Sequence, residues 1–285
     1  MGDKTLLVQI FQPFSQYRNP FTFYYAQTYP LPPKSTVIGM LQNACDDWYG
    51  NHVGIEKWWS LKVSVHGGFE SIFWNYQSMV KGDVELSSKT EFGELSGTTL
   101  ININQNQKLP LYGEGIKSQR TPVYQQELFN GHIFIFLRGK ENLIEDIKSA
   151  LEKPRKVLSL GRSEDVIFVK DVRYVTQAGR KIRGDLRLAY PTYIKERDKE
   201  KNFPIANRKY PIYSVPMRIV FKNNDTPIKA KTEITKETER DVVFEPVIYT
   251  GYEYGLIFKN GAEVDAELYD TDTEKFRILD PWGWL

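Results

Sequence analysis

The chain has 285 residues, which is long enough for one large domain or two smaller domains with hydrophobic cores. Its 38 basic and 36 acidic residues leave a formal net charge of only +2, so binding of nucleic acid would have to come from local clusters of charge. The single cysteine, Cys45, excludes an intramolecular disulfide, and without a long apolar run or a basic leader segment we expect a cytoplasmic protein that does not enter a membrane.

The chain opens with a predicted strand and a predicted helix, joined by a polar and aromatic loop. Apolar residues over 4–11 predict the strand. Pro32 and Pro33 then give a stiff, extended path into the helix, because each ring fixes φ and restricts the residue before it. We expect Ser35 or Thr36 to cap this helix. Its buried face carries apolar residues at the i, i+3, i+4 and i+7 spacing: Val37, Met40, Leu41, Ala44, Cys45 and Trp48.

The run Lys34-Ser35-Thr36 enters this helix as in a nucleotide-binding P-loop, but prolines stand where that loop needs glycines. Pro32 and Pro33 carry no N–H group, so they cannot help to wrap a phosphate. Lys34 still lies beside the free N–H groups and the positive end of the helix dipole. Two interpretations stay open, an anion site for something larger than a nucleotide and a capped helix without a ligand.

The middle of the chain contains a second predicted strand, a long polar segment and a predicted hairpin. Alternation over residues 61–69 predicts the strand. Residues 75–120 are rich in Gly, Ser, Asn, Gln and Thr and lack apolar periodicity, and an excursion of this length inside a compact domain usually has a function. Residues 121–139 are predicted to form two strands joined by a type I′ turn at Asn130-Gly131.

A second helix, a glycine turn and a further strand follow. The pattern over residues 141–153 predicts a helix whose buried face contains Leu143, Ile144, Ile147, Ala150 and Leu151. The turn at 157–165 contains Gly161, and residues 166–175 predict a strand. The order β-α-β-β-α-β is that of a ferredoxin-like split βαβ domain. Beyond about residue 175 the sequence predicts further strands and turns.

Positive charge is concentrated between residues 153 and 187, which contain ten Lys or Arg and four acidic residues. A charge run is commonly a solvated face. However, single-stranded RNA is bound by a mixture of cations, planar groups and amides. Gly161 would let an RNA backbone approach closely, with Arg162 beside it, although an ordinary loop explains the same residues. Residues of these kinds recur in residues 14–21 and 115–124, and residues 32–36 add the cation Lys34.

The sequence offers little support for catalysis or metal binding. His52, His66 and His132 are scattered, and with one cysteine they do not form a zinc set by local spacing. A metal-independent ribonuclease would need a base near a 2′-hydroxyl and an acid for the leaving oxygen. His66 and His132 fall in predicted strands, where histidines are more often structural. We therefore expect no metal, no cofactor and no catalytic residue.

Four segments of the chain resemble one family when they are taken together. The segments are "YRNP" at 17–20, "TYPLPPKSTVIGML" at 28–41, "SQRTPVYQQELFNGHIFIFL" at 118–137 and "LSLGRSED" at 158–165. The family that they resemble is the CRISPR-associated RAMP superfamily, and within it Cas family five, the Cascade subunit that holds the 5′ handle of crRNA. The resemblance covers roughly residues 4–175.

The resemblance implies an α+β fold with two parts. Residues 1–175 would form a ferredoxin-like (RRM-like) RAMP domain with a long β-hairpin thumb inserted at about 75–120. Residues 176–285 would form a β-rich C-terminal domain. By the same analogy the turn at Lys34 would hold an RNA backbone, in a groove lined by Arg18, Lys34, Ser35, Thr36, Lys117, Arg120, Gly161, Arg162 and Ser163.

The resemblance also implies a function in antiviral defence. The chain would be a non-catalytic RNA-binding subunit of a type I Cascade complex that holds the 5′ handle and caps the backbone filament. Its partners would be crRNA, the backbone RAMP subunit, the large subunit and, indirectly, target DNA, without a cofactor. The alternative is a metal-independent endoribonuclease for precursor crRNA, because the type I-C branch cleaves with Tyr, Lys and His. This chain has no Lys-His neighbour pair. The equivalent subunit of type III complexes is a lesser alternative.

Overall fold

The computed structural model describes ten stretches of the chain. Most of the regular structure in these stretches is β-strand. The chain divides into two compact units. The first unit comprises residues 1–18, 28–73 and 127–285, and the second comprises residues 19–27 and 74–126. The described stretches are residues 2–22, 25–81, 119–196, 203–206, 210–223, 225–235, 237–251, 255–259, 262–271 and 274–285.

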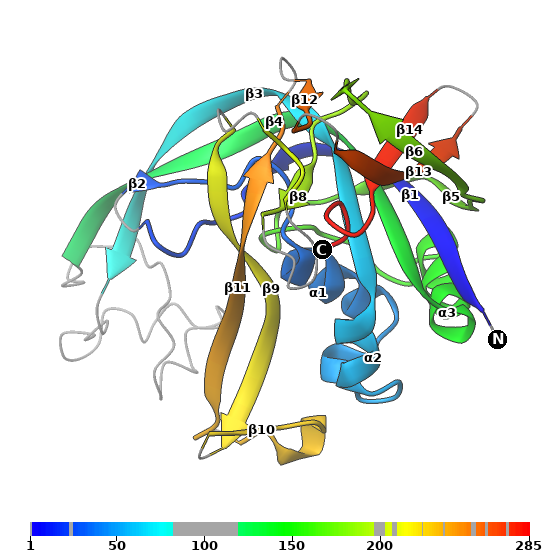
Figure 1. Ribbon diagram of the computed structural model, residues 1–285. Coiled ribbons are helices and arrows are strands. Elements are labelled where there is room, and N and C mark those ends of the chain that lie inside the picture. The colour runs from blue at the N-terminus through cyan, green and yellow to red at the C-terminus, as the bar shows by residue number, and fades with distance from the viewer. Residues whose placement is uncertain are drawn as a thin grey trace, which may run out of the picture. The chain divides into compact units, whose positions relative to one another are not determined.

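The central sheet contains four long or medium strands (Figure 1). They are β1 (Asp3–Ser15), β3 (Lys62–Lys81), β4 (Gln119–Lys140) and β5 (Phe168–Tyr174), with the short strand β2 (Tyr25–Ala26) paired to β4. β1 lies between β4 and β5 and runs antiparallel to both, and β3 also pairs with β4. The strands predicted at 4–11, 61–69 and 166–175 are confirmed, and the first two are longer than predicted.

Helices cover one face of this sheet. The α-helices of the described residues are α1 (Lys34–Ala44), α2 (Ile55–Ser60) and α3 (Glu141–Glu152), and 3-10 turns occur at η1 (Trp48–Gly50) and η3 (Lys231–Glu233). Apolar residues of α1 and α3 form one core with Leu6, Val8 and Ile10 of β1. The predicted helix at 141–153 is confirmed, with Leu143, Ile144, Ile147 and Leu151 buried. Within the described stretches, no helix combines the length and apolarity needed to cross a bilayer.

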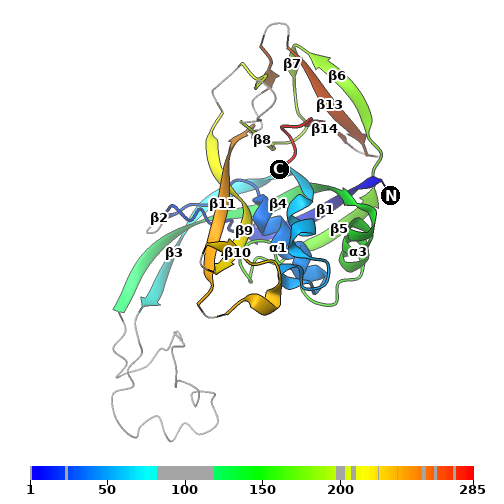
Figure 2. The same ribbon diagram turned by 60° about the horizontal axis from the view of Figure 1, so that its bottom comes forward.

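The described C-terminal part adds nine strands. β9 and β11 form a long antiparallel ribbon that packs beside α1 (Figure 1, Figure 2). Further strands form the sheets β10-β9-β11-β8, β14-β13-β6 and β12-β7. The bounds are β6 (Ala178–Arg183), β7 (Asp185–Leu186), β8 (Tyr193–Lys195), β9 (Ile212–Asn223), β10 (Thr226–Pro227), β11 (Glu239–Tyr249), β12 (Leu256–Ile257), β13 (Glu263–Asp270) and β14 (Lys275–Leu279).

The C-terminal strands share cores with the central sheet. Leu7 and Phe136 on the second face of the sheet pack in one cluster with Tyr269 and Trp284. On the helical face, residues of β8, β9 and β11 belong to the same core as α1. The boundary predicted at residues 175 and 176 lies inside the first compact unit, and the division into domains 1–175 and 176–285 stays a prediction.

The predicted hairpin at Asn130-Gly131 is wrong, because β4 runs without a break from Gln119 to Lys140. Asn130 has a positive φ of 56°, as a turn residue would, but the strand continues pairing with β1 on both sides of it. A Cβ atom at Gly131 would lie 2.2 Å from Cε1 of Phe69. The Asn-Gly pair therefore provides a local irregularity and room for a ring rather than a reversal of the chain.

The predicted side-chain cap of α1 is also wrong. The N-cap is Pro33, which has an extended conformation, and its carbonyl oxygen accepts the N–H of Val37 at 3.0 Å. Ser35 and Thr36 therefore lie inside the first helical turn. Trp48, predicted on the buried face, is 50% exposed because the helix ends at Ala44 and residues with positive φ follow. The remaining predicted face is confirmed: Val37, Met40, Leu41 and Ala44 are buried, and Cys45 is half-buried.

The predicted thumb at about 75–120 falls mostly outside the described residues. Residues 82–118, which include Lys117, lie outside them. Its flanks are described as the end of β3 and the start of β4, where Arg120 lies. Both flanks belong to the second compact unit. The thumb and its contacts with RNA stay predictions.

Candidate nucleic-acid interface

The turn around Gly161 packs tightly against the end of β1. Gly161 has a φ of +115°, and a Cβ atom built there would lie 2.7 Å from Oδ2 of Asp165 and 2.9 Å from the carbonyl oxygen of Gln16. Any other residue would adopt a strained conformation and also clash with backbone. The close approach that this glycine allows is therefore an approach to the chain's own backbone.

A buried carboxylate holds this turn to β1. Asp165 is 1% exposed, and its Oδ2 atom accepts hydrogen bonds from the backbone N–H groups of Gln16 (3.0 Å) and Arg162 (2.8 Å). Gln12 of β1 donates from Nε2 to the carbonyl oxygens of Leu160 (2.7 Å) and Asp165 (3.1 Å). These bonds fix the turn from both ends, because buried polar groups are stable only when they are paired.

The side chain of Arg162 is surrounded by carboxylates. Its Nη1 donates to Glu127 and its Nη2 to Asp165, each at 2.8 Å, and its Nε lies 3.3 Å from Glu164. Burial acts to lower the pKa of the guanidinium, but the hydrogen bonds to Asp165 and Glu127 outweigh burial and raise the pKa above its ordinary value. Ser163 is exposed and donates to Glu164 at 3.1 Å. Arg162 clamps the turn, and its contact with an RNA phosphate stays a prediction.

Arg18 lies next to this turn, so two of the predicted parts of the groove come together. Arg18 is exposed, and its backbone forms a β-bridge with Thr28. The preceding Tyr17 is buried, donates from its hydroxyl to Oε1 of Gln12 at 2.5 Å, and lies 3.5 Å from the Cβ position of Gly161. Burial raises the pKa of Tyr17 above its ordinary value, so its phenol stays protonated.

Lys34 makes contacts of a different kind at the start of α1. Its ammonium donates to the backbone carbonyl oxygens of Leu285 (3.0 Å) and Trp59 (3.4 Å). Burial lowers the pKa of Lys34 to about 8, and the charge of Lys195 acts in the same direction. A phosphate at this helix start would meet an amine that already has two protein acceptors. A role for Lys34 in RNA binding stays a prediction.

The sequence pointed to aromatic segments, but it did not show how their rings gather. In the first unit, Phe14 contacts Phe129 at a centroid distance of 5.1 Å and Phe73 at 6.4 Å. These side chains, which we call the Phe14 cluster, are 48%, 38% and 36% exposed in that order. Large rings left in water in one group indicate a surface that contacts another molecule.

The second unit carries another group of rings, which we call the Tyr25 cluster: Tyr25, Trp74, Tyr76 and Tyr124. Tyr25 and Tyr124 are stacked, with centroids 5.5 Å apart and an interplanar angle of 11°. Trp74 contacts Tyr25 at 6.2 Å, and Tyr76 contacts Tyr124 at 5.4 Å. Each side chain is at least 42% exposed. Exposed ring faces of this kind can stack on unpaired bases.

The three histidines lie in different environments. His66 is 2% exposed and hydrogen-bonded to Ser64 at 3.0 Å, and burial lowers its pKa to about 3, so it is neutral at physiological pH. The backbone N–H of His52 donates to Asp47 in the turn before α2. His132 is exposed on β4. His66 therefore has a structural environment, as expected for a histidine in a strand.

His132 shares an aromatic neighbour with a lysine. The imidazole of His132 contacts the ring of Phe11 at a centroid distance of 5.3 Å. Nζ of Lys170 lies 5.5 Å from the centroid of the Phe11 ring. These residues come from the neighbouring strands β4, β1 and β5. A search for Lys and His side by side in the sequence misses this arrangement, because strand pairing creates it.

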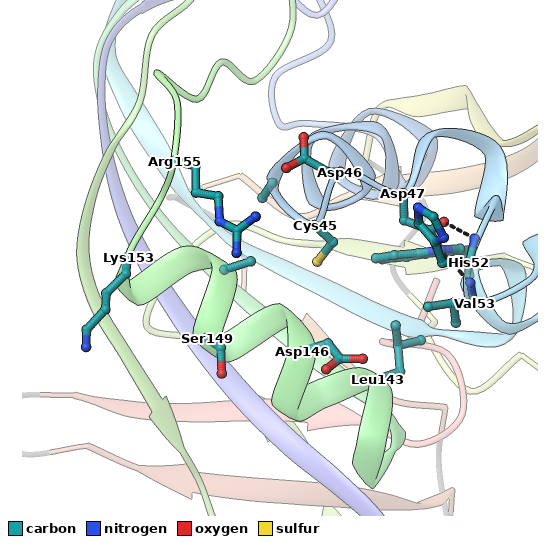
Figure 3. Close-up of a pocket in the computed structure, with 13 residues that line it drawn as sticks. Cys45, Asp46, Asp47, His52, Val53, Leu143, Asp146, Ser149, Lys153 and Arg155 are labelled. Carbon is teal, nitrogen blue, oxygen red and sulfur yellow. Dashed lines mark hydrogen bonds between the residues drawn. The ribbon is translucent and has the colours of Figure 1, made fainter.

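A cavity of about 780 Å³ lies between the end of α1 and α3 (Figure 3). Cys45 and Asp46 line it from the end of α1, and Asp146 lines it from α3. Burial raises the pKa of the Cys45 thiol to about 12, with nearby aspartates acting in the same direction, so the thiol is a poor nucleophile at neutral pH. The described lining of this cavity contains three aspartates and two cations, so the cavity does not favour a polyanion.

Comparisons with known proteins give one family match. Residues 5–253 match the family described as CRISPR-associated protein (Cas_Cas5). A comparison with curated proteins finds no match.

Several solved structures have a weak likeness to this chain. A structure described as "Crystal structure of Cas protein" is 16% identical, with a TM-score of 0.38, and the match covers 85% of this chain and 95% of that one. A chain of a "CRISPR RNA-guided surveillance complex" is 12% identical, with a TM-score of 0.43 and coverage of 86% and 91%. A CRISPR protein from Archaeoglobus fulgidus is 13% identical, with a TM-score of 0.36 and coverage of 96% and 97%.

Proposed function

Because the chain belongs to the CRISPR-associated Cas5 family, we propose that it is a non-catalytic RNA-binding subunit of a type I Cascade complex. It would hold the repeat-derived 5′ handle of crRNA and cap the backbone filament. The observation that carries this proposal beyond the family is the exposure of grouped aromatic rings in the Phe14 and Tyr25 clusters. Its further partners would be the backbone RAMP subunit, the large subunit and, indirectly, target DNA.

The aromatic clusters support RNA as the ligand. Stacking on an aromatic ring works for every base, because every base has a planar face, and this suits a subunit that holds single-stranded RNA. The Tyr25 cluster has a stacked pair with rings on either side, and Phe14 of the Phe14 cluster lies near the end of β1, four residues before the exposed Arg18. Rings and a nearby cation supply the two contacts that such RNA requires.

We further propose a ferredoxin-like RAMP domain with a thumb. The chain order β1, α1, β3, β4, α3, β5 supports it, as does the strand order β3, β4, β1, β5, in which the first and third strands are central. β3 and β4 both continue into the second compact unit, which is where a thumb inserted between them would begin. Lys117 and Arg120 would lie at the base of that thumb.

Within the groove, the residues would have different tasks. Arg18 would contact phosphates, since it is exposed beside the Gly161 turn. Gly161 and Arg162 would give the groove its shape through the bonds to Asp165, and Ser163 would lie at its surface. The start of α1, from Lys34 to Thr36, would contribute a helix end.

A second candidate is a metal-independent endoribonuclease. The observation that favours it is the pair His132 and Lys170, which both contact the ring of Phe11. A histidine could act as the base toward a 2′-hydroxyl, and a lysine could stabilise charge on the phosphate. Incubating purified protein with repeat RNA in EDTA tests this candidate: products with 2′,3′-cyclic phosphate ends, lost in His132→Gln, would support it.

The favoured function is tested by copurification from cells that express the whole Cascade operon with a CRISPR array. We expect mature crRNA and the other subunits to copurify with the tagged chain, and the bound RNA to be protected over its 5′ handle. Replacing Tyr25 and Trp74 together by Ala should lower the recovery of crRNA, because each ring offers a stacking surface.

The matched control is Ile212→Ala, which removes a 59% exposed apolar side chain of β9 that belongs to neither cluster. It should leave crRNA recovery unchanged. Equal losses in this control and the double variant would show that exposed apolar area in general, and not a stacking surface, supports assembly. A complex that forms with full crRNA occupancy when the tagged chain is omitted would contradict the proposal.

A further inference from the structure

A second, smaller cavity lies between α1 and the ribbon of β9 and β11, within the first compact unit. Its volume is about 350 Å³, within the roughly 300–1,000 Å³ range of small-molecule sites. We call it the Gln42 pocket. Side chains from α1, η1, α2, β9 and β11 line it, including Gln42, Trp48, Tyr49, Trp59, Arg218 and Arg240.

Aromatic rings form its walls and are held in place. Trp59 contacts Tyr49 at a centroid distance of 6.3 Å, and Phe221 contacts Tyr49 at 4.9 Å. The hydroxyl of Tyr49 donates to the carbonyl oxygen of Ile228 (3.0 Å) and accepts the N–H of Phe221 (3.1 Å), so this wall is fixed to β9. Trp48, half exposed, stands at the edge of the pocket. These walls suit a flat aromatic ligand.

The charge of the pocket is one-sided. Arg218 and Arg240 line it, and no carboxylate is found among its described lining residues. The guanidinium of Arg218 lies over the ring of Trp59, 5.3 Å from the centroid. The larger cavity beside Cys45 differs, because aspartates outnumber cations in its lining. Two arginines beside aromatic walls favour a ligand that is both planar and anionic.

One residue that lines the pocket has a buried polar group without a partner among the described residues. Gln42 is 7% exposed, and its amide nitrogen has no hydrogen-bond partner among the described residues. A buried donor without a partner is unfavourable, and a ligand that brings an acceptor would remove this cost. An amide that lines an aromatic pocket is suited to bond the edge of a nucleobase.

We propose that the Gln42 pocket binds one nucleotide of the RNA held by this protein. The base would stack against Trp59 and Trp48, the amide of Gln42 would bond its edge, and Arg218 and Arg240 would contact the adjoining phosphates. This inference rests on the proposed function, because that function supplies the RNA. A free nucleotide has the same chemistry, so the experiment below separates the two sources.

Gly39 offers a way to close the pocket without disturbing the core. It is an exposed residue of α1 that lines the pocket, and apart from its chain neighbours and the backbone of its own helix no described heavy atom lies within 4 Å of the place where its Cβ would be. A leucine there would extend into the pocket, whereas an alanine would leave room for a ligand. Both residues favour a helix more than glycine does, so both variants should fold.

The first arm of the test measures quenching of tryptophan fluorescence by AMP, GMP, CMP and UMP. The unaltered protein and Gly39→Ala should be quenched, and Gly39→Leu should bind at least tenfold more weakly. The second arm measures the affinity of the full chain for handle RNA in which each base in turn is replaced by an abasic nucleotide. One position should lose roughly 5- to 150-fold, the effect of one stacked base, and Gly39→Leu should remove that position's contribution.

The outcomes separate the pocket from the proposed function. RNA binding that Gly39→Leu leaves unchanged, with the same abasic profile as Gly39→Ala, overturns the pocket as an RNA site and leaves the proposed function standing, even if free nucleotides still quench. If the unaltered protein and its complex bind no RNA, the proposed function fails. Loss of nucleotide quenching in Gly39→Leu would then still support the pocket as a nucleotide site.

Discussion

The Gly161 turn and the Gln42 pocket contain the same kinds of side chain in opposite states of pairing. In the turn, the amide nitrogen of Gln12 donates to two carbonyl oxygens, and Arg162 faces three carboxylates. In the pocket, the amide nitrogen of Gln42 has no partner among the described residues, and the lining around Arg218 contains no carboxylate. A polar network whose bonds are complete stabilises the fold, whereas an incomplete one retains capacity for a ligand.

This difference changes how the sequence motifs should be weighed. A glycine with an adjacent arginine predicts a phosphate site only while the arginine has no protein partner. In the Gly161 turn the partners come from Asp165, close in sequence, and from Glu127 on another strand. The following predictions test whether complete pairing indeed separates structural residues from binding residues.

The largest effect is expected from Asp165→Asn. The buried carboxylate pairs with Arg162 and accepts two backbone N–H groups. Its replacement breaks this buried ion pair and leaves Glu127 as the close partner of the guanidinium, so it should lower the free energy of unfolding by about 3 kcal/mol. Urea unfolding followed by fluorescence measures this. Glu164→Gln is the control, because this carboxylate is 62% exposed and pairs with the same arginine. If both variants lose the same stability, the buried pair of Asp165 and Arg162 is not what holds the turn in place.

An effect of similar size, confined to acid pH, is expected from the buried imidazole of His66. Its pKa is about 3 in the folded protein and near 6.5 when exposed, so below pH 6.5 the unfolded state binds a proton that the folded state does not. The free energy of unfolding should therefore decrease as the pH is lowered, by about 3 kcal/mol from pH 6.5 to pH 4. His66→Gln should remove this slope, and the exposed His52→Gln should retain it. Parallel curves for the unaltered protein and His66→Gln would contradict the burial argument.

The amide pair gives a direct comparison of the two regions. Gln12→Leu removes three buried hydrogen bonds, two donated to the carbonyl oxygens of Leu160 and Asp165 and one accepted from the hydroxyl of Tyr17, so it should cost roughly 1–3 kcal/mol of stability. Gln42→Leu removes a donor that has no partner in the described part of the chain, so it should be neutral or slightly stabilising. Thermal unfolding of both variants gives the comparison. A loss in Gln42→Leu as large as that in Gln12→Leu would show that the pocket amide is paired in solution.

The sequence predicted the regular elements well because their signals are local. Periodicity located β1, α1, β3, α3 and β5, and the glycine turn was found at its correct position. The Asn130-Gly131 pair misled, since the same backbone conformation serves a reversal and a strand irregularity. Which of the two occurs depends on whether β1 continues to pair with β4, and this cannot be read from the dipeptide.

The contacts within the candidate site could not be predicted from the sequence, because they depend on distant partners. The basic residues and rings were identified, but Arg162 meets Glu127 only through tertiary packing. Gln42 and Arg218 are far apart in the sequence, and only the packing of α1 on β9 brings them to one pocket. Composition reports which groups are present, whereas pairing decides which of them can still bind.

The smallest effect is expected in the salt dependence of RNA binding, where Arg18 and Arg162 should differ. Arg18 is exposed, so Arg18→Gln should lower the magnitude of the log K against log salt slope by roughly 0.7, the value for one phosphate on a single strand. The control is Lys140→Gln, whose side chain is 73% exposed and pairs with Asp3, and which should leave the slope unchanged. Arg162→Gln, measured where the variant is still folded, should change the slope less than Arg18→Gln does, because carboxylates already balance this guanidinium. An equal change in both arginine variants would show that the turn binds phosphate as the sequence predicts, and that complete pairing does not prevent a residue from serving the ligand.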